Sequence, residues 1–166
     1  MINREFPHLF QPVKIRGALY RSRLLSAPNM LSQVDKGIPN SYYVDYLENK
    51  AMGGAAEVVI SEMPVNSRGA HHKAIPLDED GATLIGQMIG AIQQHGALAC
   101  AELTHAGRLA PPVYIGGQQP WGPIAETLPD GTEVLEMNEE MMDEVANDFA
   151  RAAVYFKNLG CDVVMV

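Results

Sequence analysis

The chain has 166 residues, 47% hydrophobic and 19% charged, which suits one globular domain and excludes a disordered chain. Its formal net charge of −8, from 12 basic and 20 acidic residues, repels phosphate backbones and argues against a nucleic-acid partner. No apolar signal-peptide core is visible near the N-terminus, and the most apolar long stretch, 82–101, contains three glutamines and a histidine. We therefore expect a cytoplasmic protein that does not contact a membrane.

The first forty residues predict short elements. Residues 9–21 are expected to form a small hairpin, because apolar and polar residues alternate before a glycine. Residues 24–27 are typical of a strand, which Pro28 ends because proline cannot donate to a strand ladder. Residues 29–39 are expected to be a loop.

Three segments with helical periodicity then alternate with apolar strands. The predicted helices are 41–52, 82–94 and 139–159, the last capped by Asn138. The predicted strands are 58–60, 97–103 and 162–166, and the longest predicted loops are 66–80 and 111–131. Each helix is followed by glycine and then by a continuous apolar strand, which is typical of a parallel α/β sheet with right-handed crossovers.

A doubly wound sheet and a TIM barrel both fit this alternation. No G-x-G-x-x-G or Walker A pattern follows any strand, which disfavours a dinucleotide-binding fold. A TIM barrel needs eight strands and typically about 250 residues, whereas only four strands of this kind are predicted here. We therefore expect the chain to end in the middle of a domain.

The cysteines and histidines predict no metal site. Cys100 and Cys161 lie in apolar runs, where reduced core thiols are more frequent than a disulfide or a catalytic thiol. His71, His72 and His95 do not have the spacing of metal ligands. The predicted third strand ends in the polar turn H-A-G-R at 105–108, at the strand end where parallel α/β proteins bind ligands.

Five stretches, in the right order and spacing, resemble the N-terminal half of the Old Yellow Enzyme family of NADH:flavin oxidoreductases. They are L-F-Q-P-V-K-I at 9–15, R-L-L-S-A-P-N-M at 23–30, A-M-G-G-A at 51–55 with V-I-S-E at 59–62, E-L-T-H-A-G-R at 102–108, and D-F-A-R-A-A at 148–153 with G-C-D-V-V at 160–164. The resemblance implies an FMN-binding TIM (β/α)8 barrel with an N-terminal hairpin. Residues 1–166 would be the N-terminal half of that single domain, ending within strand four.

The resemblance also implies an activity and site residues. Hydride would pass from NADH or NADPH to FMN, and from FMN to the activated C=C bond of a small enone-like substrate. The implied FMN contacts are Ala27, Pro28, Asn29, Met30, Met63 and Glu102, and the implied substrate contacts are Ser32, His105 and Arg108. The family's substrate-binding pair and phosphate loops, and the iron–sulfur cluster of some members, would lie beyond strand four. No catalytic residue is therefore assigned, and we expect the parent protein to be the enzyme and the 166 residues alone to be inactive.

Glu102 departs from the family's usual glutamine at this position. Glutamine can both donate to and accept from the pyrimidine edge of the flavin, whereas an ionised glutamate can only accept. Its negative charge would lie near the edge where reduced flavin gathers negative charge, so Glu102 should make reduction harder.

Two other functions remain open at this point. The chain can be a non-catalytic half-barrel that acts by assembling with a partner or with itself, since its sheet would leave two unpaired edges. It can also be a TIM-barrel hydrolase or metal enzyme that uses Glu62, Glu102 and His105 at strand ends. A homo-oligomer is expected whether or not the protein binds flavin.

Overall fold

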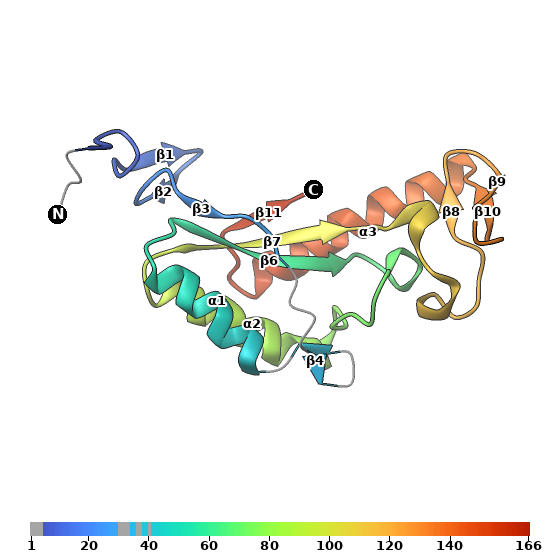
Figure 1. Ribbon diagram of the computed structural model, residues 1–166, viewed down its shortest axis with the longest axis horizontal. Helices are drawn as coiled ribbons and strands as arrows, with labels where there is room; N and C mark the ends of the chain where they lie inside the picture. Colours follow the sequence, from blue (N-terminus) through green and yellow to red (C-terminus); the bar gives the residue numbers. More distant parts are fainter. Residues whose placement is uncertain (1–4, 30–33, 36–37, 40) are drawn as a thin grey trace.

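The computed structural model describes residues 5–29, 34–35, 38–39 and 41–166. The N-terminal hairpin is confirmed: β1 (Val13–Ile15) pairs antiparallel with β2 (Ala18–Tyr20). It lies at one end of the molecule, beside the start of the main sheet (Figure 1).

The main sheet has four parallel strands in the order β11-β7-β6-β3. These are β3 (Leu25–Ser26), β6 (Glu57–Pro64), β7 (Leu98–Thr104) and β11 (Val163–Met165). Strands that follow one another in the chain are neighbours in the sheet, with no reversal of order. That arrangement is the one a TIM barrel requires, and a doubly wound sheet would instead reverse its order at a switch point.

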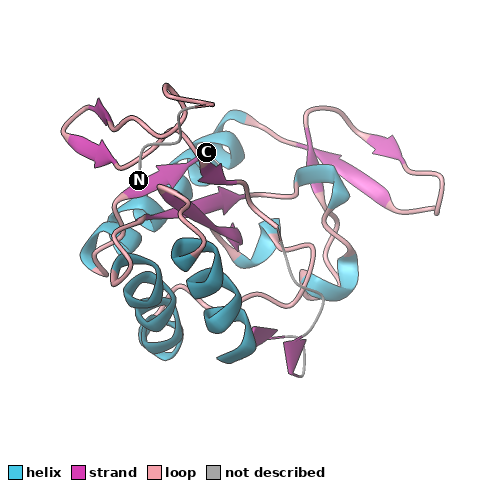
Figure 2. Cartoon of the chain, turned by 60° about the vertical axis from the view of Figure 1, so that its left-hand side comes forward, coloured by secondary structure: helices cyan, strands magenta, loops and turns pink. Residues whose placement is uncertain are grey.

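Helices connect the parallel strands and cover one face of the sheet. They are α1 (Ser41–Met52), α2 (Glu79–Gln93) and α3 (Glu139–Asn158). Figures 1 and 2 show α1 and α2 side by side against β6 and β7, with α3 farther along the sheet. Helix α2 begins before the predicted residue 82, because the Asp78 carboxylate caps it by accepting from the N–H groups of Asp80 and Gly81.

The hydrophobic core lies between the sheet and these helices. Alternate residues of β6 and β7 point into it, among them Ile60, Ala101 and Leu103, and they pack against apolar side chains of all three helices. The largest fully buried side chains on the helices are Leu47, Ile85, Met88, Ile89, Ile92 and Phe156. Cys100 is buried and Cys161 half-buried, and both are free thiols, as predicted. Burial raises the pKa of Cys161 to about 11, so this thiol is inert at neutral pH.

Arg21 fastens the hairpin to the ends of two helices. Its Nη2 donates to the carbonyl oxygens of Ala51 at 2.6 Å and Ala55 at 2.7 Å, and its Nη1 donates to the carbonyl oxygen of His95. These carbonyls lie at or just beyond the C-terminal ends of α1 and α2, where a cation is favoured by the helix dipole. This contact fixes the N-terminal edge of the sheet, opposite the strand ends that carry the candidate site.

Two predicted loops contain strands, so the loop predictions are wrong there. Within 29–39, β4 (Val34–Asp35) pairs antiparallel with β5 (Ile38–Pro39). Within and after 111–131, a second sheet has the order β8-β10-β9. Its strands are β8 (Trp121–Gly122), β9 (Glu126–Thr127) and β10 (Glu133–Glu136), preceded by the 3-10 turns η2 (Gly107–Leu109) and η3 (Pro112–Tyr114). Strands of two residues are too short to show alternation in a sequence.

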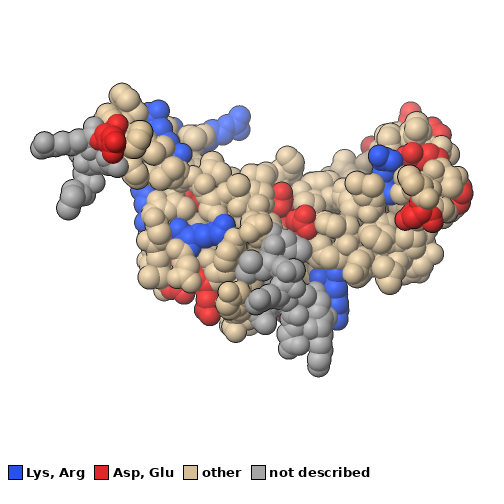
Figure 3. All heavy atoms as spheres, in the orientation of Figure 1, with Lys and Arg blue, Asp and Glu red and all other residues tan. Residues whose placement is uncertain are grey.

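The β8-β10-β9 sheet forms a separate lobe at the far end of the molecule from the hairpin (Figure 1). Acidic side chains gather on it (Figure 3), and its strands and turn contribute Glu126, Asp130, Glu133 and Glu136. These are four of the 20 acidic residues of the chain.

Candidate functional site

The candidate site lies where β6 and β7 reach their C-terminal ends. Ala101 and Leu103 of β7 face the helices, so by alternation Glu102 between them faces the opposite side of the sheet. Its side chain is half-buried. The three helices do not cover this face, which we call the uncovered face although Val59 and Cys100 on it are buried. Glu102 lies at its strand ends, where parallel α/β proteins bind ligands.

A β-bulge in β6 lies directly opposite Glu102. Ile60 pairs with Ala101 and Met63 pairs with Leu103, so Ser61 and Glu62 together oppose the single residue Glu102. Glu62 has a φ of 54°, in the left-handed region that non-glycine residues rarely adopt. The bulge therefore changes the direction of the chain where the strand ends.

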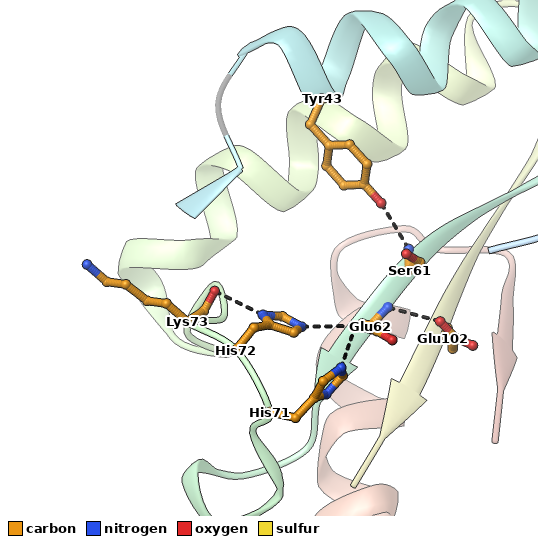
Figure 4. Close-up of polar contacts among 7 residues, drawn as sticks. All are labelled: Tyr43, Ser61, Glu62, His71, His72, Lys73 and Glu102. Carbon is orange, nitrogen blue, oxygen red and sulfur yellow. Dashed lines mark hydrogen bonds and ion pairs between the residues drawn. The ribbon is translucent and has the colours of Figure 1, made fainter. Parts of the chain in front are cut away.

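Side chains from two neighbouring elements satisfy the backbone of this bulge (Figure 4). The N–H of Ser61 donates to the hydroxyl of Tyr43 on α1 at 3.2 Å. The N–H of Glu62 donates to Oε2 of Glu102 at 3.0 Å. Glu102 thus has a structural contact within the chain that the sequence did not reveal, and this contact orients its carboxylate at the strand end.

The predicted flavin-binding segment after β3 is described only in part. Ala27 is exposed and Pro28 is half-buried, and the Asn29 Nδ2 donates to the hydroxyl of Tyr46 at 2.8 Å. Two of the predicted contacts, Met30 and Ser32, lie outside the described residues.

Met63 belongs to the hydrophobic core, with a relative exposure of 2%. Its side chain lies on the helix-covered face with Ile60 and Leu103, opposite Glu102. Only the main chain of Met63 can therefore contact a ligand on the uncovered face. Methionine is larger than the small residue usual in the family, but its side chain does not occupy the uncovered face.

The H-A-G-R turn is held by contacts within the chain. The Nδ1 of His105 accepts from the N–H of Gly107 at 3.1 Å, and the N–H of Ala106 donates to the carbonyl of Gly69 at 2.9 Å. Gly69 packs so closely on the imidazole that a Cβ there would lie 2.5 Å from Cδ2 of His105. Burial lowers the pKa of His105; the Arg68 cation lowers it too, while Asp148 opposes the shift. His105 is therefore a neutral ring that shapes the turn.

Arg108 points toward the second sheet. Its Nη1 lies 3.0 Å from Oε1 of Glu126 on β9, and its side chain is 47% exposed. This ion pair connects the H-A-G-R turn to the β8-β10-β9 lobe.

The structure assembles one group of side chains that the sequence did not predict. The carboxylate of Glu62 lies 3.1 Å from Nε2 of His71 and 3.2 Å from Nε2 of His72. Among the described residues, these three are the group whose geometry can hold a metal ion; Glu62, Glu102 and His105, the set considered for a metal enzyme, do not form one. The spacing of the histidines alone does not indicate this group, because their common carboxylate partner, Glu62, lies nine residues before His71.

A cavity of about 610 Å³ lies beside this group. It is lined by the segment 64–77, including His72, and by Val113 and Tyr114 of the loop after β7.

Comparison with known proteins places the chain in a family. Residues 8–166 match the NADH:flavin oxidoreductase / NADH oxidase family, so the chain belongs to it. A metal reductase of Desulforamulus reducens is 30% identical over 162 residues, covering 95% of this chain and 24% of that protein. An NADPH dehydrogenase of Listeria monocytogenes is 25% identical over 163 residues, covering 95% of this chain and 47% of that protein. The chain therefore spans about half the length, or less, of these relatives.

Solved structures confirm the fold. The Old Yellow Enzyme homologue of Zymomonas mobilis superposes with a TM-score of 0.82 at 21% identity, covering 95% of this chain and 47% of that one. The four parallel strands are thus part of a TIM barrel, as the resemblance implied. Family membership supports FMN as cofactor and NADH or NADPH as reductant. Within the described residues, no helix is both long and apolar enough to span a membrane.

Proposed function

We propose that the protein is an FMN-dependent NAD(P)H oxidoreductase of the ene-reductase type, and that residues 1–166 form the N-terminal half of its single barrel domain. The family match over residues 8–166 supports the flavin chemistry. The observation that carries the proposal is the placement of Glu102, on the uncovered face at the end of β7, with its carboxylate held by the Glu62 N–H. That is the position to which the family resemblance assigns contact with the pyrimidine edge of the flavin.

The edges of the sheet support the half-barrel part of the proposal. The two edge strands, β3 and β11, carry apolar side chains that are partly open to solvent: Leu25 is 57% exposed and Val164 is 39% exposed. Further barrel strands would pair with these edges and cover such side chains.

The described residues fit a flavin on the uncovered face. Glu102 supplies an oriented acceptor, and the Met63 side chain is turned into the core, so it does not occupy the face of Glu102. FMN, when bound, supplies hydride transfer between a reduced nicotinamide and an activated C=C bond. Pro28 lacks an N–H, and its ring fixes its own φ after β3, in the segment that would line the flavin ring.

The H-A-G-R turn would form the mouth of the substrate site. His105 is held in place by Gly107 and Gly69, so its proposed role is to position the turn. Arg108 would have to leave Glu126 to contact an anionic group of a substrate. We propose a small enone-like substrate, a cytoplasmic location, self-association, and no nucleic-acid or membrane partner.

Anaerobic half-reactions test the proposed function. The protein with its complete barrel is loaded with FMN, freed of excess cofactor, and mixed first with NADPH or NADH and then with 2-cyclohexenone. We expect the oxidised-flavin absorbance to bleach with one of the nucleotides and to return when the enone is added. Flavin that binds but is reduced by neither nucleotide would contradict the oxidoreductase proposal. A protein that takes up no FMN yet self-associates would favour the non-catalytic half-barrel.

A further inference from the structure

The loop after β6 places two adjacent imidazoles on one carboxylate. Nε2 of His71 and Nε2 of His72 lie 3.1 Å and 3.2 Å from the same oxygen, Oε2 of Glu62. Neighbouring residues in an extended chain point to opposite sides, but here the rings meet edge to face with centroids 4.8 Å apart. Figure 4 shows both rings converging on Glu62, whose main-chain nitrogen points the other way, toward Glu102.

The tautomer of His72 leaves a lone pair facing this carboxylate. Nδ1 of His72 lies 3.0 Å from the carbonyl oxygen of Lys73, which can only accept, so Nδ1 carries the proton. In the neutral ring Nε2 is then unprotonated. It is buried and makes no hydrogen bond within the described part of the chain. A lone pair on nitrogen then faces a carboxylate oxygen at 3.2 Å, an arrangement that is stabilised by a cation between the two atoms, either a proton or a metal ion.

We propose that Glu62, His71 and His72 bind a divalent transition-metal ion, with Zn²⁺ as the best match. Bonds of about 2.0–2.2 Å at tetrahedral angles place neighbouring ligand atoms about 3.3 Å apart. The two N···O separations, 3.1 Å and 3.2 Å, agree with that value, and all three ligand atoms lie within 4.8 Å of one another. Two imidazoles with one carboxylate suit zinc better than calcium or magnesium, which prefer oxygen ligands.

The surrounding structure is of the kind that supports a metal site. The Lys73 carbonyl fixes the ring of His72 through Nδ1, as outer contacts do for metal-binding histidines. The β-bulge re-aims Glu62 toward the loop, and the N–H of Glu62 is held by Glu102. The three side chains are 22–40% exposed, so an ion has access from solvent. A bound ion would tie the 65–78 loop to the end of β6 and leave a fourth coordination position open.

Zinc titration of the purified protein tests the proposal, independently of flavin binding. Metal is removed with EDTA, and Zn²⁺ is added in competition with a chromophoric chelator. We expect one Zn²⁺ per chain, and affinity at least tenfold weaker in His71→Ala and in His72→Ala. The matched control is His95→Ala, because His95 pairs with Glu48 at 2.9 Å with similar exposure but without a second histidine. This variant should bind Zn²⁺ as the unaltered protein does.

The visible spectrum of the Co²⁺-substituted protein provides a second measurement. Ligand-field bands of a four-coordinate Co²⁺ ion are expected, and they should be lost in the two histidine variants and kept in His95→Ala. Circular dichroism checks that each variant is folded; if His72→Ala is not, the 40% exposed His71 decides the test through His71→Ala. Absence of stoichiometric binding, or equal affinity in all variants, would overturn the proposal and leave a proton-bridged ion pair.

Discussion

The carboxylate of Glu102 on β7 accepts a hydrogen bond from the main-chain N–H of Glu62 on β6, at 3.0 Å. The contact crosses the sheet at the β-bulge, where Glu62 has left the regular strand ladder. One residue therefore holds the shape of the strand end and, in the proposed function, also faces the flavin. A substitution that changes its charge but keeps an acceptor oxygen separates these two roles.

Glu102→Gln is expected to raise the reduction potential of bound flavin. The amide oxygen can still accept from Glu62, while the negative charge is removed and a donor is gained. Charge effects at short range in a protein are about 1–3 kcal/mol, equivalent to roughly 20–60 mV for a two-electron couple. A potentiometric titration measures the shift. Asp143→Asn, which removes an exposed charge on α3, is the control, and an unchanged or lower potential in Glu102→Gln would refute the assignment.

Tyr43→Phe should destabilise the fold through the same bulge. The hydroxyl of Tyr43 accepts from the Ser61 N–H, and the side chain is 3% exposed, so its removal leaves a buried donor without a partner. We expect a loss of about 1–3 kcal/mol in the free energy of unfolding, measured by urea denaturation. Tyr114→Phe removes a hydroxyl from a side chain that is 46% exposed and should change stability little. Equal stability of the two variants would show that Tyr43 does not support the bulge.

Gly69→Ala should disturb the H-A-G-R turn. An added Cβ would lie 2.5 Å from Cδ2 and 3.0 Å from the Cα of His105, so the ring and the turn must move. We expect destabilisation of about 1–3 kcal/mol, the usual cost of overpacking, together with weaker FMN binding. Gly90→Ala is the control, because a Cβ there meets nothing within 4 Å and the position is helical. That substitution should stabilise the protein by about 0.5–1 kcal/mol, and thermal denaturation distinguishes the two results.

The burial of His105 predicts a dependence of stability on pH. Its pKa in the folded protein is below the ordinary value of 6.5, so the unfolded chain binds a proton more readily than the folded one. The contribution of His105 is present above pH 6.5 and is lost as the pH falls through the lower folded pKa. His105→Asn keeps an acceptor for the Gly107 N–H but does not titrate. Unfolding free energies at several pH values should converge for the two proteins at acid pH, and parallel curves would contradict the prediction.

Much of the fold could be predicted because it depends on local pattern. The alternation of apolar strands with glycine-terminated helices indicated the parallel sheet, and the segments that became α1 and α3 were placed almost to the residue. The lobe after β7 was not predicted, because β8 and β9 have only two residues each and so show no alternation of apolar and polar residues. The P-D-G sequence at 129–131 is a turn signal that could have indicated the β9–β10 hairpin.

The candidate site was predicted less completely, since its details depend on contacts between distant segments. The resemblance placed Glu102 at a strand end, but only the structure shows that Glu62 holds its carboxylate. The bulge of β6 turns Met63 into the core and aims Glu62 at two histidines of the following loop. No local sequence pattern predicts a bulge of this kind.

The visible absorption spectrum of the purified protein with its complete barrel, recorded after incubation with FMN and removal of the unbound cofactor, tests the central claim most directly. The account predicts that the absorption bands of oxidised flavin remain with the protein and shift from those of free FMN, and that Glu102→Gln perturbs them further. A folded protein that stays colourless would contradict the claim that the uncovered face at Glu102 holds a flavin.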